Sequence, residues 1–256
     1  VKSRAVSGAK GKPQSKADVV NRWAPTVKFE SVYMGLRVAL REKRHLSTID
    51  FTAAFLNADI PEQVTPEGIK FRRILEITPD MVDLILKIQP SWEEYICQGR
   101  GNNLSNKGSI FFVIDKALYG LIEASFAWHT ELSNTLHQMG FQQSDSDPCV
   151  YHSYQNGDKS SIIVYVDDLL IMAKSQRRTI EIRKQLQAKY KALTTRDFNE
   201  RDELDYLNVQ IRQKRNLRGE TISYELHQTT YANKIIDDLD MRDIESPFES
   251  TTLPYT

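Results

Sequence analysis

The stretch SSIIVYVDDLLIMAK, residues Ser160 to Lys174, places two adjacent aspartates inside the most hydrophobic segment of the chain. Its apolar flanks are typical of buried β-strands, so it predicts a β-hairpin whose turn is formed by Asp167 and Asp168. Asp-Asp without glycine is a poor choice for a turn that needs positive φ at both central residues. The two like charges also repel each other beside an apolar core. A bound divalent cation would relieve that repulsion, and carboxylate oxygens suit Mg²⁺.

A third carboxylate at the end of another apolar strand would complete such a site. The best candidate is Asp50, because STID (residues 47–50) is typical of a strand end and FTAAF follows directly. Two Mg²⁺ ions held between these carboxylates can activate an attacking hydroxyl and stabilise the leaving oxygen of an in-line phosphoryl displacement. An ordinary turn without metal is the other interpretation of the aspartates taken in isolation.

Composition sets the class of protein. The chain has 256 residues with 40% hydrophobic and 27% charged residues, which is ordinary for a globular protein of one large domain or two subdomains. Its net charge of zero argues against a uniformly basic nucleic-acid coat, although residues 1–17 and Arg177–Lys191 are locally basic. Cys97 and Cys149 lack metal-ligand spacing, so a disulfide framework or structural zinc is not expected. No apolar stretch is long enough to span a membrane. Because the sequence begins at Val1, we expect it to be cut from something longer.

Hydrophobic periodicity predicts a mixed α+β order. The basic segment from Ser175 is expected to be a helix with Ile180, Leu186 and Leu193 facing inward. The other expected elements are helices at 31–42, 79–89, 123–139 and 230–239, strands ending near Asp50 and at 110–114, and a β-pair within 205–213 and 221–228.

Six ordered motifs carry a resemblance to the reverse transcriptase domain of copia-type LTR retrotransposons. They are TIDFTAAFLNADI (48–60), KALYGLIEASFAWHTEL (116–132), GFQQSDSDPCVY (140–151), YVDDLLI (165–171), ELDYLNVQI (203–211) and YELHQTTYANKIIDDLDM (224–241). VKSRAV (1–6) and VNRWAPTVKFESVYMGLRVAL (20–40) are similar to the family's start. The similarity runs from end to end and is weakest at 62–109, which is longer than in most family members and is expected to be an extra insertion.

The resemblance implies a right-hand polymerase fold, an α+β architecture with an antiparallel palm sheet backed by helices. The implied division is fingers at 1–45, palm motif A at 46–60, fingers or insertion at 61–115, palm at 116–205, and primer grip with the start of the thumb at 206–256. The implied reaction is template-directed attack of a primer 3′-hydroxyl on the α-phosphate of a dNTP. Asp50 and Asp167 would bridge two Mg²⁺ ions, for which Mn²⁺ substitutes, with the carbonyl of Phe51 as a further ligand. Asp168 would complete the cluster.

The same resemblance assigns substrate contacts. Phe55 matches the family's steric gate, which excludes the ribose 2′-hydroxyl; an ordinary core phenylalanine is the other interpretation. Lys2 and Arg4 match the basic pair that faces the dNTP triphosphate. The remaining implied contacts are Tyr119 and Gly120 in the nucleotide pocket and Tyr165, Leu207 and Asn208 at the primer.

Some positions depart from the family pattern: Ile122, Glu123 and Ser125 replace its common Lys, Gln and Pro, and Asn208 replaces a Gly. The implied partners are an RNA or DNA template with its primer, dNTPs, and integrase and RNase H domains of a parent polyprotein, with no membrane. The implied location is a cytoplasmic virus-like particle whose product is destined for the nucleus. Two alternatives stay open: a catalytically degenerate or domesticated nucleic-acid-binding relic of the same fold, and another two-metal enzyme such as a nuclease.

Overall fold

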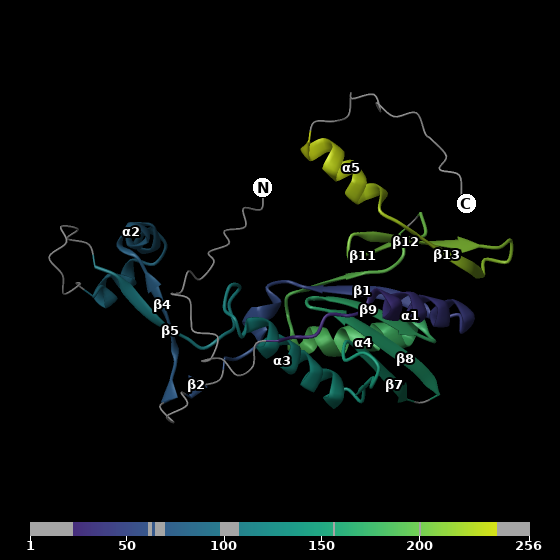
Figure 1. Cartoon of the computed structure of the whole chain (residues 1–256), viewed down its shortest axis with the longest axis horizontal. Helices are drawn as coiled ribbons and strands as arrows, with labels where there is room; N and C mark the ends of the chain where they lie inside the picture. The colour runs from purple at the N-terminus through teal and green to yellow at the C-terminus, as the bar shows by residue number, and fades with distance from the viewer. Residues whose placement is uncertain are drawn as a thin grey trace, which may run out of the picture. The chain divides into compact units, whose positions relative to one another are not determined.

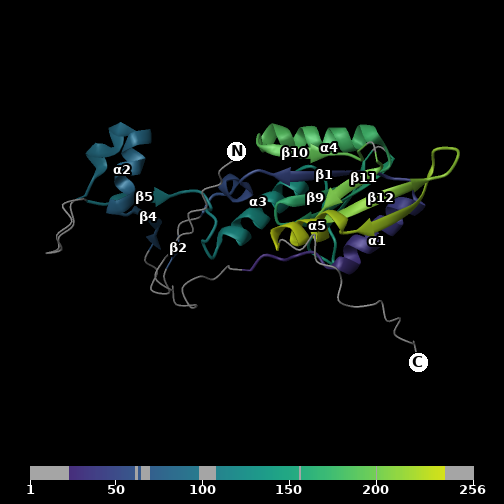
Figure 2. The same ribbon diagram turned by 90° about the horizontal axis from the view of Figure 1, so that it is seen from above.

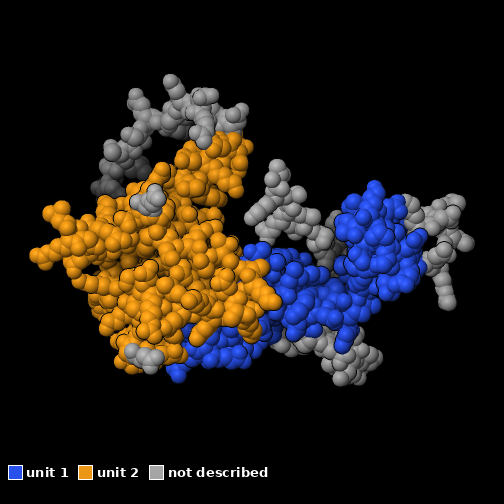
Figure 3. Space-filling model, turned by 180° about the vertical axis from the view of Figure 1, so that it is seen from behind, with its two compact units in different colours: residues 1–26, 51–142 blue, residues 27–50, 143–256 orange. Residues whose placement is uncertain are grey.

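The computed structural model describes residues 23–60, 63–64, 70–97, 108–155, 157–199 and 201–239 (Figure 1). It is a mixed α/β structure with antiparallel sheets, which confirms the α+β prediction at that level. The chain divides into two compact units, one of residues 1–26 and 51–142 and one of residues 27–50 and 143–256 (Figure 3). No described helix is both long and apolar enough to cross a bilayer.

The second unit is built on a six-stranded sheet with the strand order β10-β1-β9-β8-β7-β6. The strands are β10 (Leu193–Arg196), β1 (His45–Phe51), β9 (Asp168–Ala173), β8 (Asp158–Tyr165), β7 (Val150–Gln155) and β6 (Gln142–Gln143). From β1 to β7 every neighbouring pair is antiparallel. Residues Leu169–Ala173 of β9 are all buried, which explains their continuous apolar run: both faces of this central strand are covered.

Helices α1 (Phe29–Arg41) and α4 (Gln176–Lys189) cover opposite faces of this sheet (Figure 2). The predicted N-terminus of α4 is confirmed, since Ser175 Oγ accepts a hydrogen bond from the Arg178 backbone N–H at 3.2 Å. The predicted inward face of α4 was partly wrong. Ile182, not Ile180, is fully buried with Leu186, and Leu193 lies beyond the helix in β10 because the chain leaves the helix at Tyr190.

A smaller sheet of β11 (Glu203–Tyr206), β12 (Val209–Arg215) and β13 (Thr221–His227) precedes α5 (Thr229–Asp238). The predicted β-pair is confirmed as β12 and β13. One hydrophobic cluster joins this sheet, α1 and the large sheet. Its members include Val32 and Leu36 of α1, Leu46 of β1, Leu170 and Met172 of β9, and Leu204, Tyr206 and Ile211 of the small sheet.

The first unit contains short β-ribbons and helices. In chain order they are η1 (Ala54–Asn57), β2 (Gln63–Val64), β3 (Lys70–Phe71), β4 (Arg73–Ile77), α2 (Pro79–Ile88), η2 (Pro90–Tyr95), β5 (Ile110–Ile114) and α3 (Ala124–Gln138). Strands β2 and β3 pair with each other, and β4 pairs with β5. The predicted start of α2 after Thr78 and its end before Pro90 are confirmed.

Glu123, one of the departures from the family pattern, has a structural partner in this unit. Its carboxylate accepts a hydrogen bond from Arg73 Nε at 2.7 Å, and both side chains are largely buried. A buried charge is tolerated when it is paired. The glutamate therefore serves an ion pair that ties the start of α3 to β4.

Candidate active site

The hairpin that joins β8 to β9 turns on Val166 and Asp167, with Tyr165 and Asp168 as the closing pair. The prediction that Asp167 and Asp168 form the turn together was therefore wrong by one residue, because Asp168 is already the first residue of β9. Positive φ falls on Val166, at 54°. A β-branched residue in this region stores on the order of 1–3 kcal/mol of strain. The surrounding strands hold this turn in place against that cost.

Asp50 lies directly opposite Asp168 in the antiparallel register of β1 and β9. Tyr165 lies opposite Asp168 on its other side, across β8. Directly opposed residues of antiparallel strands have Cβ atoms about 4.5–5.5 Å apart. The sheet therefore brings Asp50 beside Asp167 and Asp168, as the sequence predicted, with Asp50, Asp168 and Tyr165 in line across three neighbouring strands. We call the three aspartates the acidic row.

The electrostatics of this row depend on Asp168. The pKa of its carboxyl is raised to about 6; burial is the largest cause, the negative charges of Asp167 and Asp50 add to it, and the positive charge of Arg196 opposes them. The negative charges of Asp50 and Asp167 thus both act on Asp168, and these are the residues expected to share a cation with it. Arg196, in β10, is a neighbour that sequence reasoning missed, and its sequence context offers no signal for this role.

The chemistry of the acidic row suits Mg²⁺. Within the described ranges, no three His, Cys, Asp or Glu side chains already stand close enough together to hold a metal ion. Mg²⁺ keeps several waters and commonly binds through one or two carboxylates together with substrate phosphates, so a closed protein cage is not required. Asp50 and Asp168 start from opposed backbone positions, and a rotation of their side chains can direct oxygens to a common point. Phe51, whose carbonyl was expected as a ligand, is the last residue of β1.

Two of the expected nucleotide-pocket residues lie together in the first unit. The ring of Phe55, in η1, is buried, and its centroid lies 4.3 Å from that of the Tyr119 ring. Gly120 follows with φ of 98°, a conformation that a side chain would strain. Lys2 and Arg4 lie outside the described residues.

The expected primer contacts lie at two turns of the second unit. Leu207 and Asn208 form the two-residue connection between β11 and β12, and both have positive φ, at 53° and 60°. Two left-handed residues are what a tight hairpin of this type requires, and Asn accepts this backbone well in place of Gly. Tyr165 is partly exposed beside Asp168.

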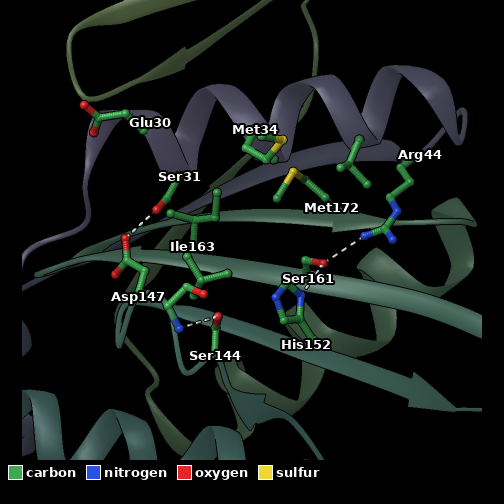
Figure 4. Close-up of a pocket in the computed structure, with 14 residues that line it drawn as sticks. Glu30, Ser31, Met34, Arg44, Ser144, Asp147, His152, Ser161, Ile163 and Met172 are labelled. Atoms are coloured by element: carbon green, nitrogen blue, oxygen red, sulfur yellow. Dashed lines mark hydrogen bonds between the residues drawn. The ribbon is translucent and has the colours of Figure 1, made fainter.

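Asp147 is a structural residue that sequence reasoning did not single out. Its buried carboxylate accepts a hydrogen bond from Ser31 Oγ at 2.5 Å (Figure 4). It also accepts from the Lys28 N–H at 3.1 Å and from the Cys149 N–H at 2.9 Å. Burial by itself would raise the pKa of Asp147, but these hydrogen bonds outweigh it and hold the pKa below its ordinary value. The carboxylate thereby caps α1 from a distant loop. The signal was its place in the GFQQSDSDPCVY motif.

A cavity of about 350 Å³ lies between α1 and strands β7 to β9, with Asp147 near one end and Arg44 near the other (Figure 4). Arg44 donates to Ser161 Oγ at 2.8 Å, and Met34, Ile163 and Met172 form apolar walls. None of Asp50, Asp167 and Asp168 lines it. The cavity is therefore separate from the acidic row.

Comparisons with known proteins show which family this chain is similar to. A family model described as reverse transcriptase (RNA-dependent DNA polymerase) matches residues 80–252. The retrovirus-related Pol polyprotein from transposon TNT 1-94 of Nicotiana tabacum is 24% identical over 94% of this chain and 15% of its own length. The one from transposon RE1 of Arabidopsis thaliana is 30% identical over 60% of this chain and 8% of its own. The chain thus spans only a small part of these relatives. Apo telomerase from Candida tropicalis, truncated from its C-terminal domain, aligns over 79% of this chain and 40% of its own, at 10% identity and a TM-score of 0.40.

Proposed function

Because the chain belongs to the reverse transcriptase (RNA-dependent DNA polymerase) family, we propose that it is the polymerase part of a copia-type retrotransposon polyprotein. It adds dNTPs to the 3′-hydroxyl of a primer on an RNA or DNA template. The opposition of Asp50 and Asp168 across β1 and β9, with Asp167 next in the chain, carries this proposal. Without that pairing, the acidic residues of the two distant motifs could not act on the same metal ions.

The acidic row holds the metal. Asp50, Asp167 and the carbonyl of Phe51 would hold two Mg²⁺ ions, and Asp168 would complete the cluster. When bound, the ions supply activation of the primer hydroxyl and stabilisation of the charge that develops on the transferred phosphate. The protein itself orients the carboxylates from rigid strands and, through the strained Val166 turn, fixes Asp167 at the tip of the hairpin.

The remaining residues bind substrate under this proposal. Phe55, supported by the Tyr119 ring, excludes the ribose 2′-hydroxyl, and Gly120 lets the backbone approach the nucleotide. Lys2 and Arg4 face the triphosphate. Tyr165 and the Leu207–Asn208 turn contact the primer.

The architecture that accompanies this function is a right hand of fingers, palm and partial thumb. Support for the palm comes from the antiparallel sheet with α1 and α4 on its faces and the acidic residues at one end. The same proposal makes integrase and RNase H domains of a Pol polyprotein the partners and a cytoplasmic virus-like particle the location.

Primer extension on an RNA template with dNTPs and Mg²⁺ or Mn²⁺ tests the function. Wild type is expected to extend the primer, Asp167→Asn to lose extension, and Asp145→Asn to retain it, since Asp145 is an exposed aspartate outside the row. Equal extension by wild type and Asp167→Asn would identify a contaminating polymerase and refute the catalytic claim. Tight template binding without any extension would identify a nucleic-acid-binding relic instead.

A further inference from the structure

The acidic row and the hydrophobic cluster occupy one face of the large sheet. Side chains alternate between faces along a strand, so Asp168 shares its face with Leu170 and Met172. By the register of β1 and β9, Asp50 lies on the same face as Leu46. Leu46, Leu170 and Met172 all belong to the cluster that the small sheet covers. The side chains of Asp50 and Asp168 therefore project from the face on which β11 and β12 pack.

Tyr206 carries a hydroxyl into that cluster. It is the last residue of β11, it is 4% exposed, and its hydroxyl has no hydrogen-bond partner within the ranges that the structure describes. Leaving a buried hydroxyl unpaired costs about 1–3 kcal/mol, and a phenylalanine would fill the same space without that cost. A phenol at this position therefore calls for a partner in another state of the site.

The charges around the phenol point to the partner. Burial raises the pKa of Tyr206, and among the groups whose charge raises it further the carboxylate of Asp168 has the largest effect, ahead of Cys149 and Tyr165. Burial likewise raises the pKa of Cys149 to about 12, which leaves that thiol neutral. Asp168 lies two residues before Leu170 on the sheet face that this cluster covers, so its carboxylate is the acceptor that we assign to the phenol donor.

The backbone around Tyr206 holds the phenol rigidly. Tyr206 pairs with Val209, and the two residues between them both take left-handed conformations. The turn fixes the backbone of Tyr206, and burial of its side chain leaves the ring little room to follow a moving partner. The carboxylate of Asp168, at the start of a strand, is the group that must rotate.

We propose that Tyr206 is a positioning residue for the metal site: its hydroxyl donates a hydrogen bond to one oxygen of Asp168 when the other turns toward the metal. The inference rests on the proposed function, because it takes Asp168 as part of the metal-binding cluster. Partners that hydrogen-bond a ligating carboxylate fix its orientation, and removing one typically weakens metal affinity about 10–100-fold. The metal-free protein, in contrast, gains nothing from the hydroxyl.

Binding of Mn²⁺ to the metal-free chain, measured from the loss of the free-ion EPR signal, separates these roles. Tyr206→Phe is expected to weaken Mn²⁺ binding at least about 10-fold while its melting temperature without metal is unchanged or higher. Tyr151→Phe is the matched control, because the Tyr151 phenol is equally buried but accepts a hydrogen bond from Gln143 Nε2 at 3.2 Å. That control should lose stability and keep its Mn²⁺ affinity. Adding Mg²⁺ should produce a near-ultraviolet tyrosine difference spectrum that Tyr206→Phe lacks.

The possible outcomes distinguish the positioning role of Tyr206 from the proposed metal-dependent function on which it rests. Wild-type binding that Asp168→Asn abolishes supports the metal site, and a weakened Tyr206→Phe then supports the positioning role. Equal Mn²⁺ affinity in wild type and Tyr206→Phe overturns the positioning role while the metal site stands. Absence of binding by wild type refutes the metal site itself, and unchanged binding by Asp168→Asn overturns the positioning role, which acts through Asp168.

Discussion

Asp50 faces Asp168 across the antiparallel pair of β1 and β9, at the strand ends where the hairpin of β8 and β9 closes. The two residues come from motifs that are far apart in the chain, and the strand register alone makes them neighbours. Their opposition collects negative charge at one end of the sheet. The metal-free fold therefore carries an electrostatic cost at the position where a cation is proposed to bind.

The first prediction is that Asp168→Asn stabilises the metal-free protein at neutral pH. The pKa of Asp168 is raised from its ordinary 3.8 to about 6, so its contribution to stability is complete below pH 4 and is lost as the pH rises through about 6. The amide does not titrate and escapes this loss. After allowance for solvent screening at this half-buried carboxyl we expect a gain of about 1 kcal/mol at pH 7.5.

Urea unfolding in EDTA at pH 4 and pH 7.5 measures this difference. Asp145→Asn, which removes an exposed carboxylate, should follow wild type at both pH values. A variant Asp168→Asn whose advantage over wild type is as large at pH 4 as at pH 7.5 would contradict the electrostatic explanation.

The second prediction concerns the distant cap of α1. Asp147→Asn should lower the unfolding free energy at pH 7 by about 2 kcal/mol, because the carboxylate accepts three hydrogen bonds in a buried place and an amide oxygen can replace it only in part. Since the pKa of Asp147 is lowered, its stabilisation is present above the ordinary carboxyl pKa and is lost as the pH falls through the folded value. The difference between wild type and variant should thus shrink in acid.

Circular dichroism during urea titration checks the Asp147 effect, and Ser31→Ala should reproduce part of it. A change to Asn that leaves stability untouched at pH 7 would show that the three hydrogen bonds contribute nothing net.

The third prediction is that Val166→Gly relieves the strain of the hairpin turn. Glycine accepts the φ of 54° without a Cβ clash, so we expect a gain of about 1 kcal/mol after the larger chain entropy of glycine in the unfolded state is subtracted. Val164→Gly, two residues earlier in the buried strand β8, should instead be strongly destabilising. Thermal unfolding compares the two, and a Val166→Gly protein less stable than wild type would mean that the valine side chain contributes more than its backbone costs.

The fourth prediction follows from the family resemblance and the packing of Phe55. Phe55→Val should raise ribonucleotide incorporation relative to deoxynucleotide incorporation by about 10–100-fold, the range that one pocket contact provides. Single-nucleotide primer extension with matched rNTP and dNTP concentrations gives the ratio. Phe111→Val, at an exposed position of β5, is the control that should keep wild-type sugar selection. Unchanged selection in Phe55→Val would assign the ring to the core alone.

The sequence was sufficient for the features that depend on neighbouring residues. Apolar periodicity located α1, α3, α4 and the strands on both sides of the aspartates, since the burial of one face repeats every few residues. Asn208, which stands where the family resemblance has a Gly, takes a left-handed φ that Asn accepts well. The carboxylates of Asp50, Asp167 and Asp168 could be singled out because a charge beside an apolar segment is costly unless a partner or a cation compensates it.

Only the tertiary structure decided which distant residues meet. A one-residue difference in strand register changes which side chains face each other, and the register of β1 against β9 joins strands that are far apart in the sequence. The folded structure has Val166 rather than Asp168 in the turn and Asp50 opposite Asp168. It also brings Asp147 to the start of α1 and buries the Tyr206 hydroxyl on the face of the acidic row. Apart from the Val166 turn, which lies within one hairpin, each of these depends on packing between segments far apart in the chain, and no single segment encodes it.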